Sequence, residues 1–503
     1  MASFLWRATV ITHRYLGVAV GLLMLVWFAS GIVMMYVAYP ELTDRDRLSS
    51  LASIPWEGCC LLYTQKFADD DPIRAVQIQS LADEPVMRIR PEGRPGRLSS
   101  LGVSGPTLQL DERKARTIVL DAAQRIIGHD AQPVLSEIID RDQWTVGDAG
   151  EGNRPLFHFV FDDPKGTHIY VSGTTGEVVL WTTATQRFWN WFGAIPHWLY
   201  FTQLRSNGPL WAQIVIWTSF LGGFLTVIGL ILGISQFKRG NNGRISPYRG
   251  WFYWHHLAGL LFGIVTLTWV VSGTLSMNPW GFLEGGGGNE RIRVAGEPLT
   301  WGAVRDSIEA IRQAAPTGVV RLTTAILDGK LFWVAAQRNG TMQRLDAQGR
   351  KAVVTAADLQ AATQRLAGSV PIESQELVTG EDPYYFAFGI AERRDPPPFP
   401  VYRVILNDSE HTRYYLDAGT GELLRKVDAD GRGYRWLFSG LHRLDFAAWL
   451  RLRPIWDMIM LALLLGGIGI TATGTYLALS RIKRDLTFRR APRGADLIRP
   501  PAE

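Results

Sequence analysis

Four long apolar windows interrupt an otherwise polar chain. Each window lacks Asp, Glu, Lys and Arg entirely, and each is long enough to cross a hydrocarbon layer of about 30 Å as a helix. The pattern therefore predicts an α-helical membrane protein with four transmembrane helices. The windows run from Tyr15 to Pro40, from Ser206 to Phe237, from Trp251 to Leu283 and from Met458 to Ser480.

The windows divide the 503 residues into alternating apolar and polar segments. The two long polar segments are rich in Gly and Pro and ordinary in charge, which is typical of soluble domains. The first window is too long for a signal peptide and is followed by no small-residue cleavage site, so we expect a retained anchor. We expect transmembrane helices within 1–40, 206–237, 251–283 and 454–480, outer domains at 41–205 and 284–453, a loop at 238–250 and a tail at 481–503.

Basic residues predict the orientation. They gather before the first window, in the loop 238–249 and in the tail "RIKRDLTFRRAPRG". Short basic segments stay in the cytoplasm, so both termini should be cytoplasmic and both large domains should lie outside. The net charge of +5 is then a topology signal, and no nucleic-acid partner is expected. The residues are Arg7, Arg14, Lys238, Arg239, Arg244 and Arg249 and those of the tail.

The chain also repeats itself. An offset of 242 aligns the first window with the third, and an offset of 245 aligns the second with the fourth. The second offset also carries "GTTGEVV" at 173–179 onto "AGTGELL" at 418–424. We therefore predict two copies of one unit, related by a pseudo-two-fold axis along the membrane normal. Matched pairs include Gly17 and Gly259, Ser30 and Ser272, Trp191 and Trp436, Pro209 and Pro454, Trp211 and Trp456, and Gly229 and Gly474.

The outer domains are predicted to be α+β. Each has a helix candidate followed by strands, with glycine-rich "TTGE" or "GTGE" turns where positive φ is needed. A further helix-plus-strands block at 299–354 is expected in the second half only. The candidates are a helix at 111–128 with strands at 156–162 and 167–180, and a helix at 355–368 with strands at 401–406 and 412–425.

Four histidines form two matched pairs at the ends of the apolar windows. His13 aligns with His255 near the cytoplasmic face, and His197 aligns with His442 near the outer face. An imidazole at the membrane is costly to place and can ligate a metal. A haem near the pseudo-two-fold axis could take one axial imidazole from each copy, giving one haem in each leaflet. Two axial imidazoles favour electron transfer over oxygen chemistry.

Other readings of these residues stay open. A single histidine at the end of a span is usually an interfacial polar residue, but preservation of all four between the copies disfavours that reading. His256 aligns with Arg14 and is the alternative partner of His13. The remaining histidines have no symmetric partners and are expected at ordinary surface or strand positions. They are His129, His158, His168 and His411.

Small and aromatic residues near the histidines allow two interpretations. Glycines in the spans leave room for a porphyrin or serve close helix packing. Most tryptophans anchor the spans at the interfaces, whereas a few lie deeper and are candidates for packing between the two haems. The glycines are Gly17, Gly21, Gly259 and Gly263, and the deeper aromatic residues are Trp27, Phe28 and Trp269.

Other metal chemistry fits less well. A zinc or di-iron carboxylate site needs carboxylate or thiolate partners at matched positions, and the spans offer none. The two cysteines, Cys59 and Cys60, are adjacent, and no CxxCH motif for covalent haem is present. We expect them to form a local loop feature or a vicinal disulfide.

The order of these motifs resembles a known family. "HRYLG" opens the first span, "HHLAG" opens the third, and TGE-type turns lead into the second and fourth. In this the chain is similar to the PepSY-associated transmembrane proteins of bacterial inner membranes, which include ferric-siderophore reductases with two b-type haems. The resemblance implies His13, His255, His197 and His442 as haem ligands, and PepSY-like modules as the two periplasmic domains.

The implied function is a haem-dependent ferric-siderophore reductase of the bacterial inner membrane. Electrons would pass from the cytoplasmic haem to the outer haem and reduce a ferric siderophore or other ferric chelate, releasing Fe(II). No GxGxxG motif follows a strand, so a cytoplasmic flavoprotein or a membrane quinol must supply the electrons. The rival interpretations are a PepSY-type binding protein that modulates a peptidase, and a permease that moves a siderophore or metal without redox chemistry.

Overall fold

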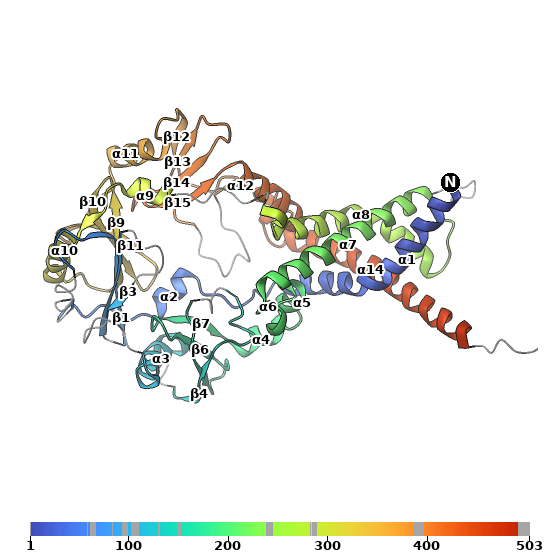
Figure 1. Cartoon of the computed structure of the whole chain (residues 1–503), viewed down its shortest axis with the longest axis horizontal. Coiled ribbons are helices and arrows are strands. Elements are labelled where there is room, and N and C mark those ends of the chain that lie inside the picture. Colours follow the sequence, from blue (N-terminus) through green and yellow to red (C-terminus); the bar gives the residue numbers. More distant parts are fainter. Residues whose placement is uncertain are drawn as a thin grey trace, which may run out of the picture.

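Four long helices form a bundle that carries a large domain at one end (Figure 1). The computed structural model describes residues 2–490 except 58, 61–66, 83, 93–98, 102–109, 129–130, 148–151, 238–244, 282, 284–288 and 386–396. The helices are long and apolar enough to span a membrane, so the protein is a membrane protein. They are α1 (Ala2–Met34), α7 (Gly208–Ser235), α8 (Trp251–Ser276) and α14 (Ile455–Arg490).

Several helix bounds differ from those of the charge-free windows, α1 and α8 among them. Helix α1 begins at Ala2, well before Tyr15, because a helix can continue beyond the apolar layer. Helix α8 ends at Ser276 rather than near Leu283, since Asn278 and Trp280 adopt positive φ angles that interrupt helical geometry.

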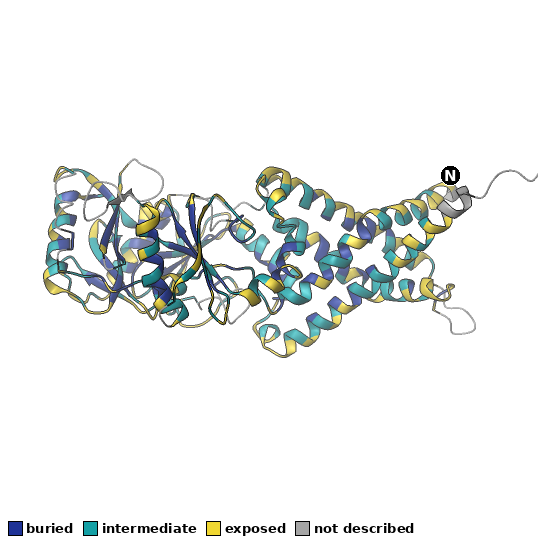
Figure 2. Ribbon diagram, turned by 90° about the horizontal axis from the view of Figure 1, so that it is seen from below, coloured by how far each residue is buried: buried dark blue, intermediate teal, exposed yellow. Residues whose placement is uncertain are grey.

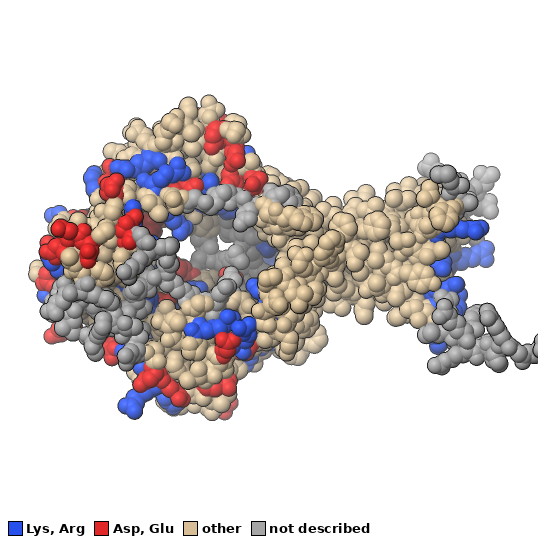
Figure 3. Space-filling view, viewed as in Figure 1, with Lys and Arg blue, Asp and Glu red and all other residues tan. Residues whose placement is uncertain are grey.

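Charge is distributed unevenly along the bundle. On the face drawn in Figure 3, Lys and Arg gather at the end away from the outer domain, and the shaft between is uncharged. The predicted basic residues Lys238, Arg239 and Arg244 and the tail beyond residue 490 lie outside the described residues. Figure 2 shows the buried residues concentrated in the sheets of the outer domain and along the inside of the bundle.

Each half contributes one four-stranded antiparallel sheet with a helix against it. We call these the first and second outer modules. Helix α3 (Glu112–Ile127) buries Ala115 and Val119, and α11 (Ala356–Ala367) starts with the predicted capping box of Thr355 and Asp358. The strands are β4 (Pro133–Ile139), β5 (Leu156–Phe161), β6 (His168–Ser172) and β7 (Val178–Thr182), and β12 (Ile372–Val378), β13 (Val401–Leu406), β14 (Arg413–Asp417) and β15 (Leu423–Val427).

A third sheet joins the two halves. Its strand order is β11-β10-β9-β1-β2-β3, and β8 also pairs with β1. The strands of the block at 299–354 therefore pair with strands of the first half, and the two outer segments share one sheet. The strands are β1 (Pro72–Leu81), β2 (Glu84–Pro91), β3 (Ser99–Leu101), β8 (Leu299–Thr300), β9 (Val319–Leu327), β10 (Lys330–Gln337) and β11 (Met342–Asp346).

Strands β1 and β9 form the seam of this shared sheet. They pair antiparallel, with Gln77 opposite Thr323 and Ile78 opposite Leu322. Ile78 and Leu322 have no exposed surface, and Trp301, at the start of α10 (Trp301–Ala314), belongs to the same core. The halves are thus held together outside the bundle by a buried sheet.

Short helices connect the sheets to the bundle. In both halves they follow the last strand of the outer module and lead into a transmembrane helix. They are α4 (Ala184–Asn190), α5 (Ala194–Trp198) and α6 (Thr202–Arg205) in the first half, and α12 (Ala429–Tyr434), η3 (Arg435–Gly440), α13 (Leu441–Arg443) and η4 (Ala448–Arg451) in the second. The other short elements are α2 (Asp44–Ser50), η2 (Pro279–Gly281) and α9 (Glu290–Ala295).

The shared sheet generates a stability prediction. Leu322→Ala should lower the free energy of unfolding of the outer domain by about 2–5 kcal/mol, because it leaves a cavity at a fully buried seam position. Leu377→Ala is the matched control, since Leu377 is 54% exposed on an edge strand. Urea unfolding in detergent, followed by tryptophan fluorescence, measures both. An equal loss of unfolding free energy in the two variants would show that the seam does not stabilise the outer domain.

Candidate functional site

The structure brings the four histidines of the spans together as two pairs. His13 on α1 faces His255 on α8, and their ring centroids are 6.3 Å apart. His197 on α5 faces His442 on α13, also with centroids 6.3 Å apart. Each pair takes one ring from each half of the chain, as the repeat predicts.

The separation within each pair suits a metal between the rings. Two imidazole nitrogens on opposite sides of one metal lie about 4 Å apart, since each metal–nitrogen bond is about 2 Å long. The rest of the 6.3 Å is the distance from each nitrogen to the centroid of its own ring, counted once for each ring. Both pairs therefore have the spacing of a single ion or a haem iron with two axial imidazoles.

We call His197 and His442 the outer pair, and His13 and His255 the inner pair. Matched features of the two halves position the outer pair. Leu199 and Leu444 take left-handed φ angles of 53° and 55°, which end the short helices that carry His197 and His442. The indole nitrogen of Trp211 then donates to the carbonyl of Trp198 at 2.8 Å. Trp456 donates to the carbonyl of Arg443 at the same distance. Tryptophans at the starts of α7 and α14 thus hold both short helices in place.

The outer rings are oriented by α1 and α8. Nδ1 of His197 lies 3.0 Å from the Trp27 carbonyl and 3.1 Å from the Ser30 hydroxyl. Nδ1 of His442 lies 3.0 Å from the Ser272 hydroxyl and also interacts with the backbone of Trp269. A carbonyl only accepts hydrogen bonds, so Nδ1 carries the proton and Nε2 keeps its lone pair. This is the tautomer that a metal requires.

The rings of His13 and His255 also direct Nδ1 at a main-chain carbonyl of a neighbouring helix. Nδ1 of His255 lies 3.1 Å from both the Ile470 carbonyl and the Thr473 hydroxyl. His13 interacts with the backbone of Leu225, 245 positions before Ile470, in a looser contact than an ordinary hydrogen bond. The contacts of the four rings therefore repeat with the same two offsets as the rings themselves.

His256 does not face His13. Its Nδ1 lies 2.8 Å from the Ser246 hydroxyl and its Nε2 lies 2.8 Å from the Gly233 carbonyl, so both nitrogens are already bonded. The side chain is buried at 7% exposure, whereas His13 and His255 keep part of their surface accessible. Of the two candidates, it is His255 that the structure places opposite His13.

Glycines near the rings separate into two classes. A β-carbon at Gly229 would lie 2.9 Å from Cε1 of His13, and one at Gly474 would lie 3.0 Å from Cε1 of His255. Only glycine lets these helices approach the rings so closely. A β-carbon at Gly17 or Gly259, one turn beyond His13 and His255, would meet no described atom within 4 Å.

The other two predicted glycines serve packing. A β-carbon at Gly21 would lie 3.2 Å from the Thr475 hydroxyl, and one at Gly263 would lie 2.6 Å from the Leu230 side chain. Of these four glycines, Gly17 and Gly259 are the two with open space beside them, at equivalent places in the two halves.

An aromatic core fills the bundle between the two pairs. Phe28 and Trp269 are both 5% exposed, with ring centroids 5.8 Å apart, and Trp27 packs against the same cluster. His13 and Ser30, which contacts His197, are separated by about 25 Å along α1 at 1.5 Å per residue. The pairs therefore lie near opposite ends of the apolar shaft.

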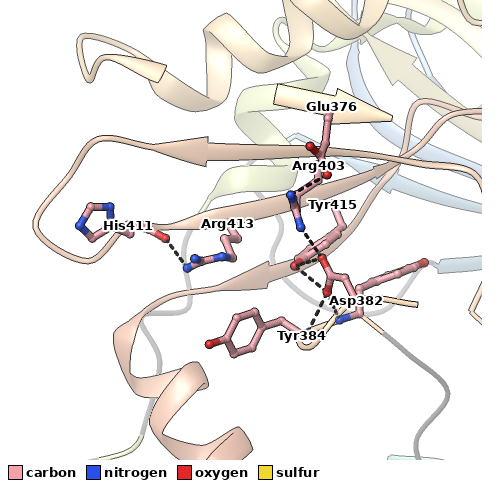
Figure 4. A network of polar contacts seen from close by, with 8 residues as sticks. Glu376, Asp382, Tyr384, Arg403, His411, Arg413 and Tyr415 are labelled. Carbon is pink, nitrogen blue, oxygen red and sulfur yellow. Dashed lines mark hydrogen bonds and ion pairs between the residues drawn. The ribbon is translucent and has the colours of Figure 1, made fainter. Parts of the chain in front are cut away.

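The outer modules carry polar networks at equivalent positions. In the second module, Arg403 forms ion pairs with Glu376 and Asp382 at 2.6 and 2.9 Å, and the Tyr415 hydroxyl donates to Asp382 at 3.0 Å (Figure 4). In the first module, His158 and His168 stand at the positions of Arg403 and Arg413, 245 residues earlier.

The network of His158 and His168 in the first outer module was not predicted from the sequence. His158 is buried at 6% exposure and bonds to Glu137 and His168, so it is not an ordinary strand residue. The same offset of 245 that matched the spans could have drawn attention to the exchange of arginine for histidine. His411 pairs with Glu373 at 2.6 Å near the surface, and His129 lies outside the described residues.

The two cysteines form a disulfide. Cys59 and Cys60 are buried against the shared sheet, beside a cavity of about 40 Å³ that Trp301 and Arg305 also line. The cavity is far too small for a haem or a ferric chelate, so this feature belongs to the core of the shared sheet.

Comparison with known proteins shows which family the chain belongs to. No curated protein matches it. The family described as PepSY-associated TM region matches residues 10–315, a segment that includes His13, His197 and His255. This segment covers more than half of the sequence, and the chain therefore belongs to the PepSY-associated TM region family.

Proposed function

We propose that the protein is a di-haem ferric-siderophore reductase of the bacterial inner membrane. It would pass electrons from the cytoplasmic side to a periplasmic ferric siderophore or similar ferric chelate and release Fe(II). The observation that supports this most is the pair of facing imidazoles at each end of the bundle, with centroids 6.3 Å apart and Nδ1 directed at a neighbouring helix.

The residues at both pairs fit a b-type haem. His13 and His255 would ligate one haem, and His197 and His442 would ligate the other. The space beside Gly17 and Gly259 would admit the inner porphyrin. Haem held by these histidines would supply one-electron transfer.

The protein's own groups would tune and protect this transfer. Hydrogen bonds from Nδ1 to the carbonyls of Trp27 and Ile470 fix the rings and raise the basicity of Nε2. Phe28 and Trp269 exclude water from the region between the pairs. Reduction to Fe(II) weakens binding by hard oxygen chelators, so release of iron follows the electron.

We further propose that the halves arose by duplication and are related by a pseudo-two-fold axis along the membrane normal. Support comes from the rings, their Nδ1 contacts, the Trp211 and Trp456 bonds and the outer sheets, which all recur at offsets near 245. Each four-stranded outer sheet with its helix would then be a PepSY-like periplasmic module.

The orientation follows from charge. The basic end of the bundle in Figure 3 would lie in the cytoplasm with both termini, and the outer domain in the periplasm. Figure 3 also shows an opening between the outer modules beside the end of the bundle where His197 and His442 lie. A ferric chelate would enter there. A cytoplasmic flavoprotein or a membrane quinol would donate the electrons.

Haem content tests the pairing. The purified protein should contain two haems per chain, with the visible spectrum of two axial imidazoles. His13→Ala or His255→Ala should remove about one haem, and His197→Ala combined with His13→Ala should remove both. His256→Ala is the matched control and should keep two. A protein without a haem spectrum would favour the peptidase-modulating or permease alternatives.

Space beside the inner pair gives a second prediction. Gly17→Leu should lower the haem content to about one per chain, because the new side chain would enter the gap at the inner pair. Ala19→Leu, at an exposed position of the same helix, should keep both haems. Equal haem content in the two variants would show that the gap at Gly17 does not hold the porphyrin.

Reduction of a chelate tests the activity. The protein reduced with dithionite and freed from excess reductant should be reoxidised by a ferric siderophore, with Fe(II) trapped by a ferrous chelator. Stopped-flow absorbance of the haem measures the rate. Haem that stays reduced in the presence of several ferric chelates would exclude this substrate class.

A further inference from the structure

The first outer module holds a cluster of side chains that electron transfer through the bundle does not require. Nε2 of His158 on β5 lies 3.0 Å from Nδ1 of His168 on β6. The other nitrogen of His158, Nδ1, lies 2.8 Å from Glu137 on β4. Tyr170 stacks on the His158 ring at 4.5 Å. Three adjacent strands thus present two imidazoles and a carboxylate to one another.

The distance between the two imidazole nitrogens fits two different arrangements. One is a hydrogen bond with a single shared proton. The other is a pair of ligands on one cation. Bonds of 2.0–2.1 Å place neighbouring ligand nitrogens about 2.9 Å apart at a right angle and about 3.3 Å apart at the tetrahedral angle. A carboxylate on the far nitrogen of an imidazole is a frequent partner of metal-bound histidine.

The second module has an arginine at this place. Arg403 stands at the position of His158 and is paired across the strands with Glu376, as His158 is with Glu137. Its guanidinium lies between Glu376 and Asp382 (Figure 4). In this module the cluster contains a permanent positive charge.

The first module keeps the carboxylates, with His158 in place of the arginine, and the guanidinium of Arg187 lies near enough to interact electrostatically with Asp142 and Tyr170. Tyr170 donates to Asp142 at 2.6 Å, as Tyr415 does to Asp382. Among the described residues, neither Glu137 nor Asp142 forms an ion pair with a lysine or arginine. A bound cation would supply, beside the imidazoles, the positive charge that Arg403 provides in the second module.

The His168 ring can be approached by an ion. Arg187 donates to Thr182 and to the Gly166 carbonyl. His168 is only partly buried, which leaves a way in for an ion and for water.

We propose that His158 and His168 bind a divalent transition-metal ion. Glu137 would orient His158 from its far nitrogen, and water would complete the coordination. Imidazole ligands suit Fe(II), Ni(II), Cu(II) and Zn(II). The site lies in the outer module and does not depend on haem in the bundle.

Metal titration of the full-length protein tests this site. The protein is stripped of loosely bound metal, and Zn(II) and Ni(II) are titrated by calorimetry. The wild type should bind one more equivalent than the His158→Arg/His168→Arg variant, which installs the residues of the second module. His411→Asn, at an exposed histidine paired with Glu373, should bind like the wild type.

A second, more conservative variant distinguishes loss of the metal site from misfolding of the module. His168→Gln keeps a polar side chain and should weaken zinc binding at least tenfold. Zinc should raise the Tm of the wild type, since a ligand of the folded state stabilises it, and should not raise that of His168→Gln. The haem spectrum should be the same in all variants. Equal zinc binding by the wild type and both histidine variants would overturn the proposal.

Discussion

The arrangement of the bundle depends on hydrogen bonds between imidazoles and main-chain atoms of neighbouring helices. A ring placed among apolar helices must satisfy its Nδ1, and carbonyls such as those of Trp27 and Ile470 meet this need with an acceptor beyond their own helical bond. Such contact requires the helix and ring to approach closely, which is why glycines stand at Gly229 and Gly474. Helix packing, ring orientation and the Nδ1-protonated tautomer are consequences of the same constraint.

Much of this arrangement could be predicted from the sequence, because it is local or repeated. Uncharged windows define spans, Thr355 and Asp358 mark a helix start, and two offsets pair His13 with His255 and His197 with His442. The repeat favours His255 over His256 but could not settle the choice, since neighbouring residues on a helix differ in direction by about 100° and only the position of the facing helix selects one of them.

The shared sheet could not be predicted from the sequence, for a different reason. Most residues of β1 are buried to some degree, and the strand has no clean alternation of polar and apolar residues that would reveal a strand with one exposed face. Its partner β9 follows more than two hundred residues later, and local pattern carries no information on such pairing. The network of Glu137, His158 and His168 was missed similarly, because the strands that unite these residues had first to be aligned in register.

The seam between β1 and β9 also has a mechanical consequence. The halves are joined at one end by helix packing and at the other by the backbone hydrogen bonds of the seam, so together they form a closed frame around the opening in Figure 3. Spreading one outer module from the other would shear several backbone hydrogen bonds, each contributing about 0.5–1.5 kcal/mol, and would expose buried core. The paired strands therefore resist a hinge-like separation of the two outer modules.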